Sequence, residues 1–106
     1  MSFFDLFKKP DINKELEAFR DADGALLIDV RDPSEYAEGH IEGSINIPIK
    51  DIVSAKERIK DLNAPIFVYC LSGARSGRAA SILRTMGYAD TKSIGGINNY
   101  SGKLVK

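Results

Sequence analysis

Two kinds of apolar pattern alternate along this chain. Residues 25–30 and 64–69 are short, continuous apolar runs rich in β-branched and aromatic residues, which predicts strands buried on both faces. Residues 44–48 and 91–94 predict two briefer strands. Between these runs, apolar residues recur at intervals of three and four, the spacing of one helix face. The helical stripes are Ile12, Leu16 and Phe19; Ile52, Ala55, Ile59 and Leu62; and Ala79, Ile82, Leu83 and Met86.

Capping residues mark where some of these elements begin and end. Asp11 can cap the first helix, and Asp32, Pro33 and Glu35 form a capping-box arrangement for a short helix that Gly39 ends. Strands that alternate with helices predict an α/β fold with a mainly parallel sheet. Because ligands bind beyond the carboxyl ends of the strands in such sheets, we expect a pocket there. The residues that follow the strands are 29–31, Pro48, 70–75 and 95–96.

Length and charge narrow the classes of function. At 106 residues and 11.6 kDa, residues 1–106 are expected to form one domain with a single modest core. Fifteen basic residues balance fifteen acidic ones, so the electrostatic footprint of a nucleic-acid-binding protein is missing. No apolar stretch approaches the length that spans a membrane. The apolar N-terminus, with Phe3, Phe4 and Phe7, is expected to fold onto its own domain rather than to act as a signal peptide or membrane anchor.

The chain has a single cysteine, Cys70, and a single histidine, His40. One cysteine excludes an internal disulfide, a paired-cysteine redox motif and a multi-thiolate metal site within one chain, so no metal site is expected. A lone thiol suits a reducing compartment, and we expect the cytoplasm. His40 is weighed as a general base, but no serine or thiol partner is identifiable beside it. A histidine that hydrogen-bonds to brace its turn is the preferred interpretation.

Cys70 follows the strand at 64–69 and precedes the last helical stripe, which places it in a strand-to-helix turn. The first turn of a helix presents unpaired N–H groups and the positive end of the helix dipole, so it favours anions. Gly73 allows the loop to curl these N–H groups around the sulfur as an anion-binding nest. With Arg75 and Arg78 nearby, the thiol is a candidate for a lowered pKa. The alternative is a buried cysteine that only packs, but the glycine, serines and arginines after it favour an active site.

Several spaced motifs resemble the rhodanese-like domain family. They are residues 29–31, Glu35-Tyr36, 39–48, 70–76 and 95–97. The resemblance covers about residues 12–101 and leaves residues 1–10 as an N-terminal extension. It implies a three-layer α/β/α domain with a mainly parallel five-stranded sheet, and a cysteine that carries sulfur as a persulfide without a metal or organic cofactor. Tyr100 departs from the family, which often has tryptophan there, and the usual proline near the end is absent.

The resemblance also implies roles for particular residues. Cys70 would accept the sulfur, and Arg75 would hold the anionic end of a donor such as thiosulfate. Asp29, Arg31 and His40 would support the site. Because the chain has no second cysteine, the acceptor would be external: cyanide, a thiol or another protein. The loop residues that would bind the donor are Leu71, Ser72, Gly73, Ala74, Arg75 and Ser76.

Two alternatives to a sulfurtransferase stay open. A protein-to-protein sulfur relay, or a binding module with little free turnover, would use the same loop. A phosphatase or arsenate reductase would also use a cysteine and an arginine around an oxyanion, with the arginine six positions after the cysteine. Here the sixth position is Ser76 and the arginine comes fifth, so the loop is expected to be too small to encircle a phosphate.

Overall fold

The structure is a computed structural model that describes residues 9–106. Its strands are all parallel and form one sheet in the order β2-β1-β3-β4. The strands are β1 (Leu26–Asp29), β2 (Ser44–Asn46), β3 (Ile66–Cys70) and β4 (Thr91–Gly96). The expectation for Phe3, Phe4 and Phe7 concerns residues outside the described range.

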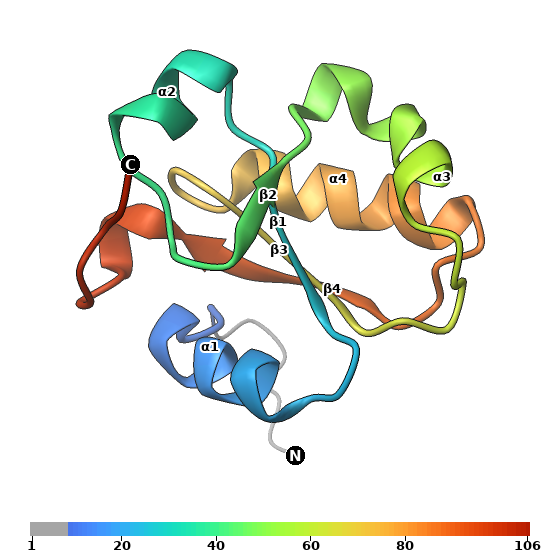
Figure 1. The fold of residues 1–106 in the computed structure, drawn as a ribbon, viewed down its shortest axis with the longest axis horizontal. Coiled ribbons are helices and arrows are strands. Elements are labelled where there is room, and N and C mark those ends of the chain that lie inside the picture. Colours follow the sequence, from blue (N-terminus) through green and yellow to red (C-terminus); the bar gives the residue numbers. More distant parts are fainter. Residues whose placement is uncertain (1–8) are drawn as a thin grey trace.

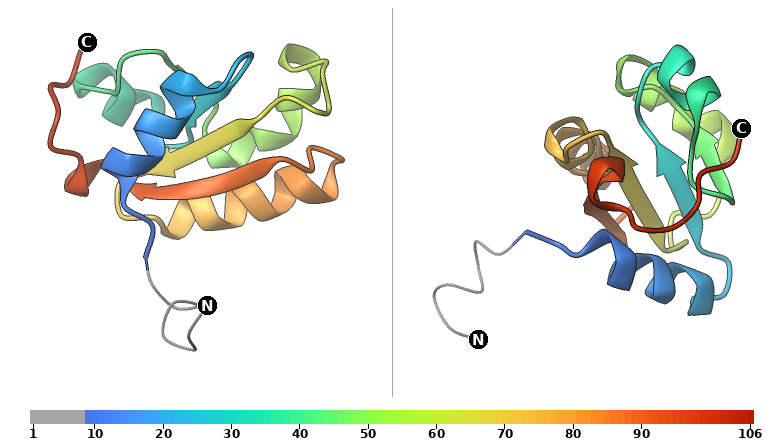
Figure 2. Two further views of the ribbon diagram at one scale, coloured as in Figure 1. Left: turned by 90° about the horizontal axis from the view of Figure 1, so that it is seen from below. Right: turned by 90° about the vertical axis from the view of Figure 1, so that its left-hand side faces the viewer.

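Helices cover both faces of this sheet, which confirms the three-layer α/β/α fold (Figures 1 and 2). One face is covered by α1, and α3 and α4 cover the other. A short helix, α2, follows β1 at the carboxyl edge of the sheet (Figure 1). The helices are α1 (Ile12–Asp21), α2 (Pro33–Glu38), α3 (Ala55–Arg58) and α4 (Ala74–Thr85), with 3-10 segments η2 (Ile49–Ser54) and η3 (Ile97–Asn99).

Alternation along the two central strands divides the core between the faces. Leu27 and Phe67 pack in the cluster beneath α1, whereas Ile28 and Val68 pack in the cluster beneath α3 and α4. Successive side chains of a strand point to opposite faces, so Cys70 falls on the same face as Val68. The last residue of β3 therefore carries its sulfur toward the start of α4.

The predicted caps are present. The Asp11 carboxylate accepts a hydrogen bond from the Asn13 N–H at 3.0 Å, at the start of α1. The Glu35 carboxylate accepts one from the Asp32 N–H at 3.0 Å, as part of the capping box expected at the start of α2. Gly39 ends α2 as predicted. These caps satisfy N–H groups that would otherwise lack partners at the helix ends.

The predicted helical stripe at residues 52–62 is wrong in its last turn. Ile52, Ala55 and Ile59 are buried, but Leu62 is 49% exposed because the helix ends at Arg58. Asp61 accepts a hydrogen bond from the Asn63 N–H at 2.8 Å, a local turn that competes with helix. In α4 one residue of the predicted apolar stripe, Ile82, is not buried, because its side chain is 38% exposed.

The expected five-stranded sheet is wrong for residues 9–106, which contain four strands. Beside β4, Pro10 approaches Gly95: a Cβ on Gly95 would lie 3.6 Å from the Pro10 carbonyl oxygen. Proline has no N–H for a sheet ladder, so this approach adds no strand. Near the C-terminus, His40 and Val105 form an isolated antiparallel bridge. Within the same described range, no helix is long and apolar enough to cross a membrane.

Candidate active site

Cys70 lies under a loop whose donors point at its sulfur. The Gly73 N–H donates to Sγ at 3.0 Å and the Ser76 N–H at 3.3 Å, while the Ser76 hydroxyl oxygen lies 3.5 Å from the sulfur. Gly73 has φ of 108°, a left-handed conformation that turns its N–H inward. The predicted anion-binding nest is therefore present at the N-terminus of α4.

The environment of Cys70 lowers the pKa of its thiol. Burial of this side chain, which is 1% exposed, acts in the opposite direction, because a thiolate is poorly solvated in the interior. Hydrogen bonds from the Ser76 hydroxyl and from the backbone N–H groups of Ser76, Gly73 and Ser72 outweigh that burial. The predicted direction is confirmed, and its main source is the loop backbone and a serine. The charge of Arg75 also interacts with Cys70.

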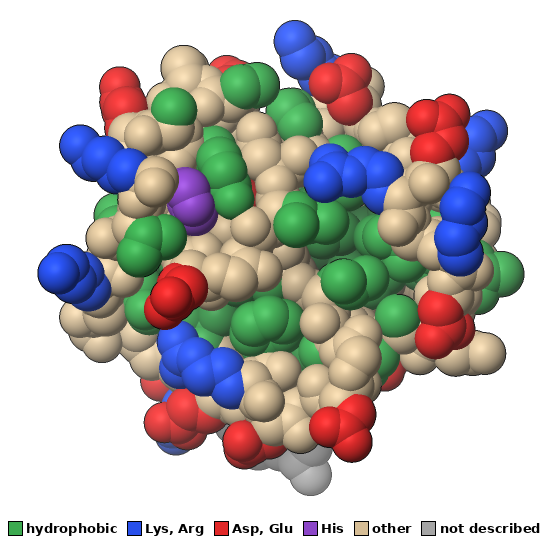
Figure 3. Space-filling model, in the orientation of Figure 1, with side chains coloured by type: hydrophobic (Ala, Val, Ile, Leu, Met, Phe, Trp, Pro, Cys, Tyr) green, Lys and Arg blue, Asp and Glu red, His purple; other side chains and the backbone are tan. Residues whose placement is uncertain are grey.

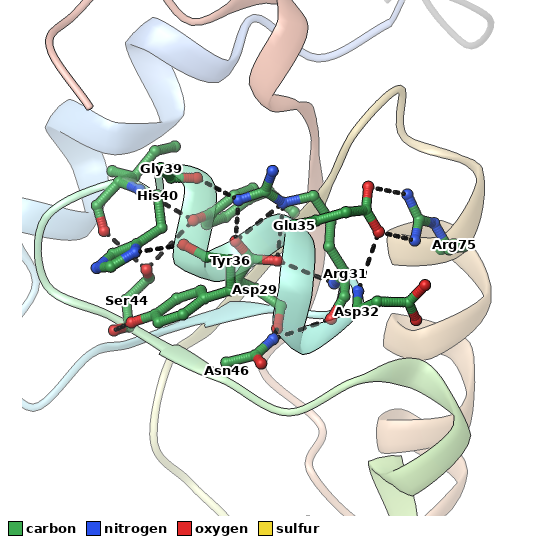
Figure 4. A network of polar contacts seen from close by, with 12 residues as sticks. Asp29, Arg31, Asp32, Glu35, Tyr36, Gly39, His40, Ser44, Asn46 and Arg75 are labelled. Carbon is green, nitrogen blue, oxygen red and sulfur yellow. Dashed lines mark hydrogen bonds and ion pairs between the residues drawn. The ribbon is translucent and has the colours of Figure 1, made fainter. Parts of the chain in front are cut away.

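Arg75 is held in an ion pair with α2 (Figure 4). Its guanidinium donates to the two Glu35 carboxylate oxygens at 2.8 and 3.1 Å. Hydrogen bonds from Arg75, with a further one from the Asp32 N–H, lower the pKa of Glu35 to about 2 although burial opposes this. The sequence indicated Glu35 as a cap of α2 and as part of a family motif, but it did not indicate the pairing with Arg75, which is forty residues away. Arg78, the other arginine that follows Cys70 in the sequence, lies in α4 and is exposed.

The supporting residues brace the carboxyl end of β1. Asp29 is fully buried, and its carboxylate accepts a hydrogen bond from the Arg31 guanidinium at 2.8 Å. The same guanidinium donates to the Gly39 carbonyl at 2.7 Å. Nδ1 of His40 lies 2.9 Å from the Tyr36 carbonyl oxygen, and its ring stacks on the Tyr36 ring with centroids 3.7 Å apart. His40 thus braces its turn, as expected, and Figure 3 shows it at the surface.

Two hollows flank residues 71–76, which we call the catalytic loop. The first has a volume of about 440 Å³ and the second about 330 Å³. The first is lined by Lys9, Pro10, Ser72, Gly73, Ala74, Ser93, Gly95, Gly96 and Asn99. The second is lined by Arg31, Glu35, Glu38, Gly39, Leu71, Ile97, Asn98 and Leu104. Of the residues expected at the pocket, Asp29, Pro48, Cys70 and Arg75 line neither hollow.

The double glycine allows the catalytic loop to lie directly on β4. A Cβ on Gly96 would overlap the Leu71 carbonyl oxygen and would lie 2.6 Å from the Ser72 Cα. The strand pairing brings this glycine opposite Cys70, with a register shift at Val68 and Tyr69. Close approach of the loop backbone therefore explains why glycine is needed at position 96.

Comparison with known proteins identifies the family. The sequence pattern of the rhodanese-like domain matches residues 13–103 of this chain. The protein belongs to the rhodanese-like domain family. It is 42% identical over 83 residues to the thiosulfate sulfurtransferase PspE of Escherichia coli, covering 74% of this chain and 77% of PspE. It is 37% identical to the thiosulfate sulfurtransferase GlpE of Pseudomonas fluorescens Pf-5, covering 78% and 74% of the two chains.

Solved rhodanese structures have the same fold. A structure described as rhodanese with anions from E. coli superposes with a TM-score of 0.72 at 37% identity, covering 77% of this chain and 98% of that one. The human single-domain sulfurtransferase TSTD1 superposes with a TM-score of 0.69 at 25% identity, covering 81% and 88%. The resemblance found in the sequence motifs is therefore confirmed.

The rhodanese-like site has the chemistry for covalent sulfur transfer. A thiolate is the nucleophilic form of cysteine, and here hydrogen-bond donors stabilise it without a general base. The same donors face any negative charge that develops at the sulfur during a reaction. Among residues 9–106, no group of three or more His, Cys, Asp or Glu side chains lies close enough together to hold a metal ion.

Proposed function

We propose that this protein is a thiosulfate sulfurtransferase of the rhodanese type. It moves a sulfane sulfur from thiosulfate, or a similar anionic donor, to a thiophilic acceptor through a persulfide on Cys70. The observation that carries this proposal is the pair of backbone N–H groups aimed at Cys70 Sγ, at 3.0 and 3.3 Å. Relatives named as thiosulfate sulfurtransferases support the choice of donor.

The reaction has two steps in this proposal. The Cys70 thiolate attacks the outer sulfur of thiosulfate, the sulfur–sulfur bond of thiosulfate breaks, and sulfite leaves with the bonding electrons. An external thiol or cyanide then attacks the outer sulfur of the persulfide, and the electron pair of that bond returns to Sγ. This is covalent catalysis with ping-pong kinetics. The loop N–H groups stabilise the thiolate that starts the first step and is regenerated by the second.

The catalytic loop supplies the donor site. Arg75 has five N–H donors and gives two of them to Glu35, so the remaining donors are available for the anionic end of thiosulfate. Its charge also acts on Cys70. The supporting pair of Asp29 and Arg31 holds the neighbouring strand end. The full set of proposed donor-binding residues is Leu71, Ser72, Gly73, Ala74, Arg75 and Ser76.

A protein-to-protein sulfur relay is the second candidate, and exposed apolar side chains favour it. Leu71, which directly follows the cysteine, is 45% exposed, and Leu104 is 44% exposed. Both line the smaller hollow, where a protein acceptor could cover them. Slow turnover of thiosulfate together with fast persulfide loading from a cysteine desulfurase would favour the relay. Fast turnover with small thiols would favour the enzyme.

Phosphate esters are not proposed as substrates. The arginine comes fifth after the cysteine, and the sixth residue, Ser76, is fully buried with its hydroxyl oxygen 3.5 Å from Sγ. We expect no turnover of p-nitrophenyl phosphate, and detectable turnover would overturn this assignment.

The cytoplasm is the compartment that we propose, because a lone reactive thiol suits a reducing environment. Cell fractionation with an antibody against the protein tests this.

The decisive experiment is the intact mass of the reduced protein after incubation with thiosulfate. The wild-type protein is expected to gain one sulfur atom, and cyanide is expected to remove it and yield thiocyanate. Cys70→Ser is the matched control, because it keeps the shape of the side chain and loses the sulfur. No gain of mass in the wild-type protein would contradict thiosulfate as the donor, and an equal gain in the serine variant would contradict persulfide chemistry at Cys70.

A further inference from the structure

A second serine extends the hydrogen-bond environment of the cysteine to β4. The Ser76 hydroxyl oxygen lies 3.5 Å from Cys70 Sγ, and the Ser93 hydroxyl oxygen lies 2.7 Å from that of Ser76. Ser76 is fully buried, whereas Ser93 lines the larger hollow beside the loop. Two hydroxyl groups in series therefore connect the sulfur to a residue that lines this hollow.

The number of hydroxyl protons restricts how the hydrogen bonds among Cys70, Ser76 and Ser93 can be arranged. A serine hydroxyl has one proton to donate, and a thiolate can only accept. In the structure the Ser76 hydroxyl also lies within reach of two carbonyl oxygens, of Gly73 at 3.1 Å and of Gly95 at 3.4 Å. When Cys70 is ionised, Ser76 stabilises the charge only if its proton turns from these carbonyls to the sulfur. Its oxygen then faces Ser93 as an acceptor.

We propose that Ser93 is a positioning residue for sulfur transfer, and that its hydroxyl donates to Ser76 Oγ and so holds the Ser76 proton on the Cys70 thiolate. The two hydroxyl oxygens are 2.7 Å apart, and either hydroxyl can donate to the other. If Ser93 donates, Ser76 keeps its own proton for the sulfur. If Ser76 donates to Ser93 instead, it has no proton left for the sulfur. Polarised hydrogen bonds in series also strengthen one another. The inference rests on the proposed function for its consequence, faster loading of sulfur at neutral pH.

Charged groups lie on the segments around this thiol, and a substitution of Ser93 removes none of them. Arg75 is next to Ser76 in α4, and its charge acts on Cys70. Lys9 lines the hollow with Ser93. The others form ion pairs on neighbouring elements, namely Glu35 with Arg75, Asp29 with Arg31, and Glu15 with Lys92. A change in the pKa of Cys70 that follows substitution of Ser93 would therefore come from the loss of the Ser93 hydroxyl.

The test compares Ser93→Thr with Ser93→Val in the full-length protein. Threonine and valine have nearly the same shape and both suit a strand, but only threonine keeps the hydroxyl. The rate of alkylation by iodoacetamide, measured against pH, gives the pKa of Cys70. Loss of one hydrogen bond predicts a midpoint about 0.5 to 1 pH unit higher for the valine variant. The threonine variant is expected to match the wild-type protein.

Below the midpoint, the valine variant should be alkylated about 3- to 10-fold more slowly, and well above it the rates should converge. Ser81→Ala, at an exposed position of α4, is the control for removing any serine hydroxyl. Equal midpoints for the threonine and valine variants would overturn the inference. Alkylation needs no thiosulfate, so a wild-type protein that gains no sulfur refutes the proposed function and leaves this comparison decisive for Ser93.

Discussion

Breaking the ion pair between Glu35 and Arg75 measures how firmly the catalytic loop is held to α2. The two hydrogen bonds are 2.8 and 3.1 Å long, and the side chains are 27% and 26% exposed. The pKa of Glu35 is about 2, against an ordinary value of 4.5. At about 1.36 kcal/mol for each pKa unit, the upper bound on this stabilisation is about 3.4 kcal/mol. Solvent screening of the partly exposed pair reduces it to about 1 to 2 kcal/mol.

The direction of the pH dependence follows from the lowered pKa. A carboxylate whose pKa falls on folding stabilises the protein fully above its unfolded pKa. The contribution of Glu35 is therefore complete above about pH 4.5 and is lost as the pH falls toward about 2. The free energy of unfolding of the wild-type protein, relative to that of Glu35→Gln, should decrease over this interval. Between pH 5 and 8 the difference should stay constant.

Urea unfolding of four proteins at pH 7 tests the magnitude: the wild-type protein, Glu35→Gln, Arg75→Met and the double variant. The coupling energy from this cycle should be about 1 to 2 kcal/mol. A coupling energy within error of zero would refute the reasoning, as would a difference that stays constant down to pH 2. The kinetics of persulfide loading separate the role of Arg75 in the ion pair from its proposed role in binding thiosulfate. Arg75→Met removes both and should raise the KM for thiosulfate more than Glu35→Gln does, which removes only the ion pair.

Three further substitutions test the site. Gly96→Ala places a methyl group against the backbone of the catalytic loop, so persulfide loading should fall at least tenfold, about 1.4 kcal/mol, while far-UV circular dichroism keeps the α/β signature. Gly73→Ala strains a residue with φ of 108° by about 1 to 3 kcal/mol, and the pKa of Cys70, measured by alkylation, should rise as the loop N–H moves away. Asp29→Asn leaves Arg31, which is 5% exposed, without its counter-charge. The free energy of unfolding in urea should fall by about 3 to 5 kcal/mol, and a fall of less than about 1 kcal/mol would contradict a buried ion pair.

Neighbouring residues alone were sufficient to predict the parts of this protein that depend on local geometry. The buried strand before Cys70, the caps at Asp11 and Glu35, and the glycine that turns the loop all follow from contacts within a few residues. The same local reasoning failed at Leu62, where a turn begun by Asp61 replaced the last helical turn. Periodicity carries no information on which of two local structures wins when both are possible.

Tertiary structure decided which distant residues meet. The order β2-β1-β3-β4 places the ends of β3 and β4 side by side, and the register shift brings Gly96 opposite Cys70. The pairing of Ser76 with Ser93 and the ion pair between Glu35 and Arg75 follow from this packing, across 17 and 40 residues of sequence. The cysteine and its loop are recognisable in the sequence because a strand-to-helix turn is local. Their partners are not, because strand order and register are set by the packing of the whole core.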